Sequence, residues 1–322
     1  MWKPVQEPQG RPSRPAIIKP AEITPANPEQ LARWLREDAD GFNRRLSETG
    51  ALVFRGFGVN HADTFAELLD GLGVERTTYR GGNSPRITLQ DGLYTSTEYP
   101  STQHISLHNE LSYSARWPSR LYFCCVQPAT TGGGTTLADG RSILESMDDS
   151  LHDTFDRRGV RYVRNLHSGI GLGRSWQATF ETEDRGEVAR VCDASRVELQ
   201  WLSDGGVRLT HVGPAVVQHP VTQERVWFNQ AEQFHPSSLP DDVSEALSAA
   251  YEGREEELPQ WVTFGDGEPI PVNSLSVIRE VTRRHTTVVD WQRGDVAIVD
   301  NLLSMHGRQP FTGAREVIVA MA

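Results

Sequence analysis

The chain has 322 residues, of which 37% are hydrophobic and 23% charged, and this balance is typical of a globular protein with a sizeable core. Its net charge of -11 argues against a nucleic-acid partner, because binding to phosphates requires clustered cations. No stretch is long and apolar enough to span a bilayer, and the three cysteines, an odd number, favour a reducing cytoplasm over a disulfide-bonded framework.

The N-terminal part of the chain predicts an arm followed by a helix-strand-helix segment. Residues 1–27 are rich in proline and are expected to form an extended arm with little core of its own. Residues 28–322 are expected to form a single domain. Apolar residues at helical intervals predict a helix that starts near Pro28. A short buried strand at 51–57 and a second helix at 61–73, closed by Gly73, follow.

A mainly β body makes up the rest of the chain. Alternating and β-branched segments predict strands at 121–128, 160–165, 197–202, 206–212, 225–231, 295–301 and 315–322. Helical insertions are expected near 140–195 and 240–286. The fold class is therefore α+β, mainly β with helical insertions, and the strands predict a jelly-roll core whose mouth is covered by helical loops.

The segment "QHISLHNELSYS" carries the first candidate site. Residues i and i+2 of a strand point to the same face, so His108 and Glu110 are expected to converge on one divalent metal ion. The alternative is a hydrogen-bonded histidine at a strand end. His104 precedes the same carboxylate, but the i+2 spacing favours His108, and His104 is expected to lie beside the site or to be structural.

Two residues near the C-terminus complete this candidate site. His306 follows an apolar strand, and two histidines with one carboxylate are the ligand set of non-haem Fe(II) oxygenases. Arg315 opens the last strand on its apolar face. An arginine in an apolar barrel is costly unless it meets an anion, and its planar fork suits a carboxylate. The alternative for Arg315 is an ion pair with an acidic residue of the core.

The ordered motifs H-x-E, G-G-x-T, H and a C-terminal G-x-R resemble the taurine dioxygenase-like Fe(II)/2-oxoglutarate oxygenases. The segments "YTSTEYPSTQHISLHNELSYS" and "MHGRQPFTGAR" are most similar in sequence to the SyrP-like branch. This branch hydroxylates amino acids or amino-acid units in natural-product pathways. The likeness runs from Gly50 to the C-terminus. It implies a double-stranded β-helix, bound Fe(II), and 2-oxoglutarate and O2 as co-substrates of an oxidoreductase that hydroxylates an unactivated C–H bond.

The resemblance also assigns residues. It makes three side chains the iron ligands: His108, Glu110 and His306. It makes Arg315 and Thr136 the contacts of 2-oxoglutarate, with Arg308 and the neighbouring Thr135 as the alternatives. No catalytic residue is expected beyond the iron ligands.

The substrate is expected to be a small amino-acid-like molecule, either free or tethered to a carrier protein, with no nucleic-acid or membrane partner. Val319 stands where the sulfonate-binding branch has a second arginine, so taurine is not expected. Five residues are candidate substrate contacts: Thr97, Glu98, Asn165, Trp176 and Phe234. Two rival functions use the same residues, namely a zinc-dependent hydrolase and a non-catalytic jelly-roll binding protein.

Overall fold

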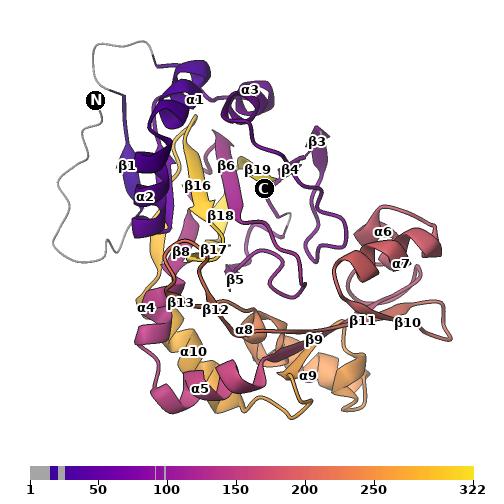
Figure 1. Ribbon diagram of the computed structural model, residues 1–322. Helices are drawn as coiled ribbons and strands as arrows, with labels where there is room; N and C mark the ends of the chain where they lie inside the picture. Colours follow the sequence, from indigo (N-terminus) through magenta and orange to yellow (C-terminus); the bar gives the residue numbers. More distant parts are fainter. Residues whose placement is uncertain (1–14, 21–25, 91, 98) are drawn as a thin grey trace.

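The computed structural model describes residues 15–20, 26–90, 92–97 and 99–322 (Figure 1). The helices are α1 (Pro28–Glu37), α2 (Ala39–Thr49), α3 (Ala62–Leu72), α4 (Gly140–Glu145), α5 (Asp149–Arg158), α6 (Trp176–Phe180), α7 (Arg185–Ala194), α8 (Ala231–Phe234), α9 (Asp241–Ala250) and α10 (Val272–Arg284), with short 3-10 turns η1 (Pro236–Ser238) and η2 (Glu255–Glu257). None of the helices in the described part of the chain is long and apolar enough to cross a membrane.

The strands form three sheets of four or more strands and two short ribbons. They are β1 (Ala16–Ile18), β2 (Ala51–Phe54), β3 (Thr88–Gln90), β4 (Leu93–Thr95), β5 (Ile105–His108), β6 (Arg120–Gln127), β7 (Thr131–Gly132), β8 (Thr135–Asp139), β9 (Val160–Leu166), β10 (Glu198–Trp201), β11 (Val207–Gly213), β12 (Val216–Gln218), β13 (Arg225–Trp227), β14 (Gln260–Phe264), β15 (Thr287–Val289), β16 (Val296–Asp300), β17 (Ser304–Arg308), β18 (Phe311–Thr312) and β19 (Glu316–Met321).

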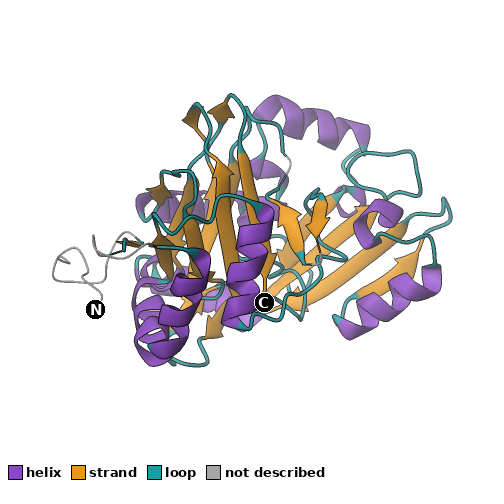
Figure 2. Cartoon of the chain, turned by 90° about the horizontal axis from the view of Figure 1, so that it is seen from above, coloured by secondary structure: helices purple, strands orange, loops and turns teal. Residues whose placement is uncertain are grey.

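The largest sheet has seven strands in the order β1-β2-β16-β6-β19-β4-β3. One of its faces packs against α1, α2 and α3, where Leu31 and Phe65 meet strand residues such as Ile298 (Figures 1 and 2). Because side chains alternate along a strand, the neighbours Cys124 and Cys125 of β6 point to opposite faces, and both are buried free thiols. This agrees with the expectation that they do not pair.

The second sheet, β15-β8-β17-β5, faces the free side of the seven-stranded sheet. Leu137 and Val289 of the second sheet share a buried cluster with Phe123 and Val319 of the first. The other face of the second sheet packs through Met305 on a separate cluster, to which α4, α8 and α10 contribute. The space between the two sheets is therefore lined by apolar side chains, and polar groups found there stand out.

The third sheet, β10-β11-β9-β14, extends away from this pair (Figure 1). Helices α6 and α7 cover part of it through a cluster that includes Trp176, Val188 and Leu209. Strands β9 and β14 and helices α6 and α7 fall within the insertions predicted near 140–195 and 240–286, whereas β10 and β11 lie between the two.

Several predicted elements are confirmed and others are corrected. The helix at 61–73 is present as α3, and Gly73 ends it with a positive φ of 70°. The helix predicted from Pro28 is broken at Asp38, because the Asp38 carboxylate caps α2 by accepting the Gly41 N–H. The strand predicted at 225–231 ends already at Trp227, and α8 follows. Within the predicted arm, Ala16–Ile18 form β1 and pair in parallel with β2.

Candidate metal centre

Two histidines face each other across neighbouring antiparallel strands. His306 in the middle of β17 is the direct partner of His108, the last residue of β5, and their ring centroids are 4.3 Å apart. Both side chains point into the space between the two facing sheets and are buried. Gly307 allows the strands to approach closely, since a Cβ there would lie 2.4 Å from the carbonyl oxygen of Ile105. The fold thus brings together two imidazoles that are far apart in sequence.

Glu110 reaches the same point from a turn rather than from a strand. β5 ends at His108, so the i, i+2 alternation that predicts convergence does not apply at Glu110. Its backbone is held by the Asn301 side chain, whose Oδ1 accepts the Glu110 N–H at 2.7 Å and whose Nδ2 donates to the Glu110 carbonyl at 3.0 Å. Leu111 next to it has φ 57°, a left-handed conformation that is uncommon outside glycine. A tertiary contact therefore positions this carboxylate.

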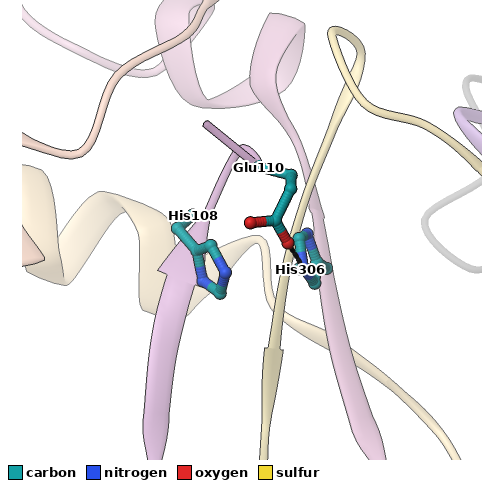
Figure 3. Close-up of side chains that lie close together, drawn as sticks. All are labelled: His108, Glu110 and His306. Carbon is teal, nitrogen blue, oxygen red and sulfur yellow. Dashed lines mark ion pairs between the residues drawn. The ribbon is translucent and has the colours of Figure 1, made fainter. Parts of the chain in front are cut away.

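The three side chains form a compact group of possible metal ligands (Figure 3). One ligand atom from each of them lies within 4.8 Å of the others, and Glu110 Oε2 is 3.7 Å from His306 Nε2. The Nδ1 atom of His108 is 2.8 Å from the Ser106 carbonyl oxygen, so Nδ1 carries the proton and Nε2 keeps its lone pair.

Burial keeps both imidazoles neutral. Desolvation lowers the pKa of His108, and it lowers the pKa of His306 well below its ordinary value, with the nearby His108 and Arg86 adding to the effect. A neutral imidazole is the form that binds metal, and two of them with one carboxylate fit Fe(II) with positions left open for other ligands. The donor set therefore suits the metal that the sequence predicts.

A cavity of about 30 Å³ is lined by His108 and His306, two of the three possible ligand residues. Arg86, Arg308 and Arg315 line it together with Thr97 and Thr135. Three guanidinium groups around one small, largely apolar space are unusual, because each of them loses hydration there. The cavity is thus suited to an anion.

The loss of hydration clearly disfavours the charged form of Arg315. Its Nε donates to the Gly133 carbonyl at 2.8 Å and its Nη1 to Ser96 Oγ at 3.1 Å, and no carboxylate of the described residues pairs with it. Burial lowers its pKa to about 10, and the positive charge of Arg308 adds to this shift. An ion pair in the core, the alternative explanation of Arg315, is not found among the described residues.

Arg308, the second choice for a cosubstrate contact, has a different set of partners. Its guanidinium donates to the carbonyl oxygens of Tyr99, Pro100 and Gln103 at 3.2, 2.8 and 2.9 Å. It therefore fixes the loop that leads into β5.

The structure places the two candidate threonines, Thr135 and Thr136, in different cavities. Successive residues of β8 face opposite sides of the second sheet, and Thr135 is the one that lines the cavity with Arg315. Thr136 instead lines a separate cavity of about 950 Å³ on the other face, to which His104 also contributes and none of the three ligand residues does. The Oγ1 of Thr135 accepts the indole N–H of Trp291 at 3.0 Å.

The predicted substrate contacts are only partly near the site. Thr97 lines the cavity, whereas Glu98 lies outside the described residues. Asn165 donates to two backbone carbonyls of the segment 256–258 and braces the third sheet. Trp176 packs against another tryptophan and Phe234 against two tyrosines, and neither lines the cavity.

Sequence reasoning missed Arg86. Its Nη2 forms an ion pair with Glu110 Oε2, and both side chains are almost fully buried. Arg86 belongs to none of the predicted helices or strands and is distant from Glu110 in sequence, so no local pattern indicates the contact. Only the fold shows it.

Comparison with known proteins finds a matching family and several similar proteins. A model of the family described as "Taurine catabolism dioxygenase TauD, TfdA family" matches residues 9–321. The dapdiamide synthesis protein DdaC of Enterobacter agglomerans is 38% identical over 276 residues, which cover 86% of this chain and 83% of DdaC. A clavaminate synthase-like protein of Arabidopsis thaliana is 30% identical over 324 residues, 95% of this chain and 93% of that protein. The crystal structure of PvcB from Pseudomonas aeruginosa shares the fold with a TM-score of 0.55 and 16% identity, covering 100% of this chain and 90% of PvcB.

Proposed function

This chain belongs to the TauD/TfdA family and is an Fe(II)- and 2-oxoglutarate-dependent dioxygenase, and we propose that it hydroxylates an unactivated C–H bond of an amino acid or amino-acid-derived unit in natural-product biosynthesis. Two relatives support this substrate class. DdaC is a dapdiamide synthesis protein, and PvcB is described as an oxygenase from an isonitrile synthetic pathway. Val319 in place of a second arginine speaks against a sulfonate, and a carrier-tethered substrate is part of the same proposal.

The proposed architecture is a double-stranded β-helix, or jelly-roll, formed by residues 28–322 as one domain after an arm at 1–27. The observation that supports it is the buried cluster between the seven-stranded and the four-stranded sheet. A cytoplasmic location is supported by the three buried free cysteines, whose thiols burial makes less acidic.

The observation that carries the functional proposal is the convergence of three buried candidate ligand groups beside Arg315, which has no acidic partner among the residues that the structure describes. We propose that His108, Glu110 and His306 hold the iron. The bound metal, with 2-oxoglutarate and O2, supplies oxidation of a C–H bond coupled to release of succinate and CO2. The protein supplies orientation and a water-poor site, and no general base beyond the ligands is required.

The residues around the cavity position the co-substrate. Arg315 offers its planar fork to the carboxylate of 2-oxoglutarate that lies far from the metal, and the gained ion pair offsets the cost of burying the guanidinium. Thr135 already accepts a hydrogen bond from Trp291, so its own O–H is free to donate to the same carboxylate. Phe123, with its ring 5.5 Å from that of His306, forms an apolar wall of the site.

The test is a mass-spectrometric screen of free amino acids and carrier-bound aminoacyl units with Fe(II), 2-oxoglutarate and O2. We expect a product one oxygen heavier than the substrate and an equal amount of succinate, and neither with His306→Ala. A zinc hydrolase would instead act without O2 and without 2-oxoglutarate, and such activity would overturn the proposal. A binding protein without catalysis would bind ligand but form no succinate.

A further inference from the structure

Arg86 is a buried cation, and most of its hydrogen-bond donors have no partner among the described residues. Its side chain is 4% exposed, and Nη2 contacts Glu110 Oε2. Its Nε and Nη1 are buried and have no hydrogen-bond partner in the part of the chain that the structure describes. A buried donor without a partner costs about 1–3 kcal/mol, and more when it is charged, so two of them on one guanidinium require an explanation.

The position of this guanidinium is well defined. It lies over the ring of Tyr79, with its central carbon 4.2 Å from the ring centroid. The Tyr79 backbone N–H donates to the Tyr94 hydroxyl, and the Tyr79 hydroxyl accepts the Ser84 N–H, so the ring itself is fixed. A planar cation stacked on a fixed ring is preorganised to bind a planar anion.

The charged groups of the cavity leave an excess of positive charge near the possible metal ligands. Arg86, Arg308 and Arg315 line the cavity, and Glu110 is the one acidic partner that the described residues offer to these three. A divalent cation held by Glu110 draws on the same negative charge, which leaves Arg86 in need of a further anion. The cavity of about 30 Å³ has room for about one water, so an organic ligand must shift side chains of the lining.

We propose that Arg86 binds the metal-proximal carboxylate of the 2-oxo acid, while Arg315 binds the distal one. The inference rests on the proposed function, and it assigns Arg86 a role that is separate from holding the metal. The two arginines contact different walls of one cavity, Arg86 at Glu110 and Arg315 at Gly133 and Ser96. A cation at each end matches a dicarboxylate.

Two probe molecules distinguish the contributions of the two carboxylates of the ligand to binding. 2-Oxoglutarate carries both carboxylates, whereas 2-oxopentanoate carries the same 2-oxo acid with a methyl group in place of the distal carboxylate. The binding of each to the Mn(II)-loaded protein is measured by titration calorimetry. We expect Arg86→Gln to weaken the binding of both probes by the same factor, about tenfold to a hundredfold. This is the effect of losing a hydrogen bond to a charged group. Arg315→Gln should weaken 2-oxoglutarate alone.

The affinity for Mn(II) is a second measurement. It distinguishes binding of the 2-oxo acid by Arg86 from a role in which Arg86 only holds Glu110 in place. Removing a positive charge from beside the ligand carboxylate should leave Mn(II) binding unchanged or tighter in the absence of a 2-oxo acid. If Arg86 only held Glu110 in place, Arg86→Gln would instead weaken Mn(II) binding and leave the 2-oxo acids unaffected. Arg80→Gln is the matched control, because Arg80 lies on the same loop and pairs with Glu187 at the surface, and it should change neither affinity.

The possible outcomes are distinct. If Arg86→Gln does not fold, Arg86→Lys, which keeps the charge but not the planar fork, is used with the same two probes and should weaken both equally. Affinities unchanged for both probes in the Arg86 variant would overturn the inference, as would a loss for 2-oxoglutarate alone. If the wild-type Mn(II)-loaded protein does not bind 2-oxoglutarate at all, the proposed function fails rather than the role of Arg86.

Discussion

Replacing Arg315 with glutamine should change stability and ligand affinity in opposite directions. Burial lowers the pKa of Arg315 to about 10, and at about 1.4 kcal/mol per pH unit this shift corresponds to roughly 3 kcal/mol against the charged form. The penalty is fully present below pH 10, where the side chain is charged in both the folded and the unfolded chain. The variant loses about 2 kcal/mol from its two hydrogen bonds to Gly133 and Ser96, at about 1 kcal/mol each. The ligand-free variant should therefore be about 1 kcal/mol more stable.

The same substitution should weaken 2-oxoglutarate binding. Truncating one partner of a buried, hydrogen-bonded charge pair costs about 2–5 kcal/mol, which is about thirtyfold or more in affinity. Urea denaturation followed by tryptophan fluorescence measures the free energy of unfolding, and calorimetric titration of the Mn(II)-loaded protein with 2-oxoglutarate measures the affinity. Both are done near neutral pH.

The variant Arg55→Gln is the control, because different effects on stability and on 2-oxoglutarate affinity are expected for it. Arg55 forms a two-point ion pair with the buried Asp295, at 2.9 and 2.7 Å, so its loss should lower the free energy of unfolding by about 3 kcal/mol and leave 2-oxoglutarate affinity unchanged. If Arg315→Gln behaves like Arg55→Gln, Arg315 is a structural arginine and our reasoning about its burial is refuted.

Three further predictions concern the site itself. His306→Ala should abolish binding of one equivalent of Fe(II) or Mn(II) in calorimetry, whereas His104→Ala, which removes a side chain from the other cavity, should retain it. Thr135→Val should weaken 2-oxoglutarate about fivefold to tenfold for one lost hydrogen bond, and the same change at Thr136 should have no effect; the reverse result would restore the sequence-based choice. As the proposed third ligand, Glu110 would occupy the position that chloride needs. A reaction under ¹⁸O₂ with excess chloride should therefore yield a hydroxylated product that carries the label, and a chlorinated product would contradict this assignment.

The sequence by itself predicted most of the elements and the candidate ligand groups. Helix α3 with its terminal Gly73 and the apolar strands β6, β16 and β19 follow from local periodicity, because burial of one face imposes a repeat that is visible in the residues. The order of the H-x-E pair, His306 and Arg315 along the chain is also a property of the sequence, and it is sufficient to indicate the family.

Only the tertiary structure decided which of these side chains meet, and from where. Glu110 is held by Asn301 from a distant strand end, so its position depends on a contact that no local pattern encodes. The choice between Thr135 and Thr136 depends on the register of β8 in its sheet, since a shift of one residue exchanges the two faces. Arg86 lies in a loop without periodicity, and its pairing with Glu110 arises from packing between segments far apart in the chain. Local propensity therefore determined the parts, and long-range packing determined the geometry of the site.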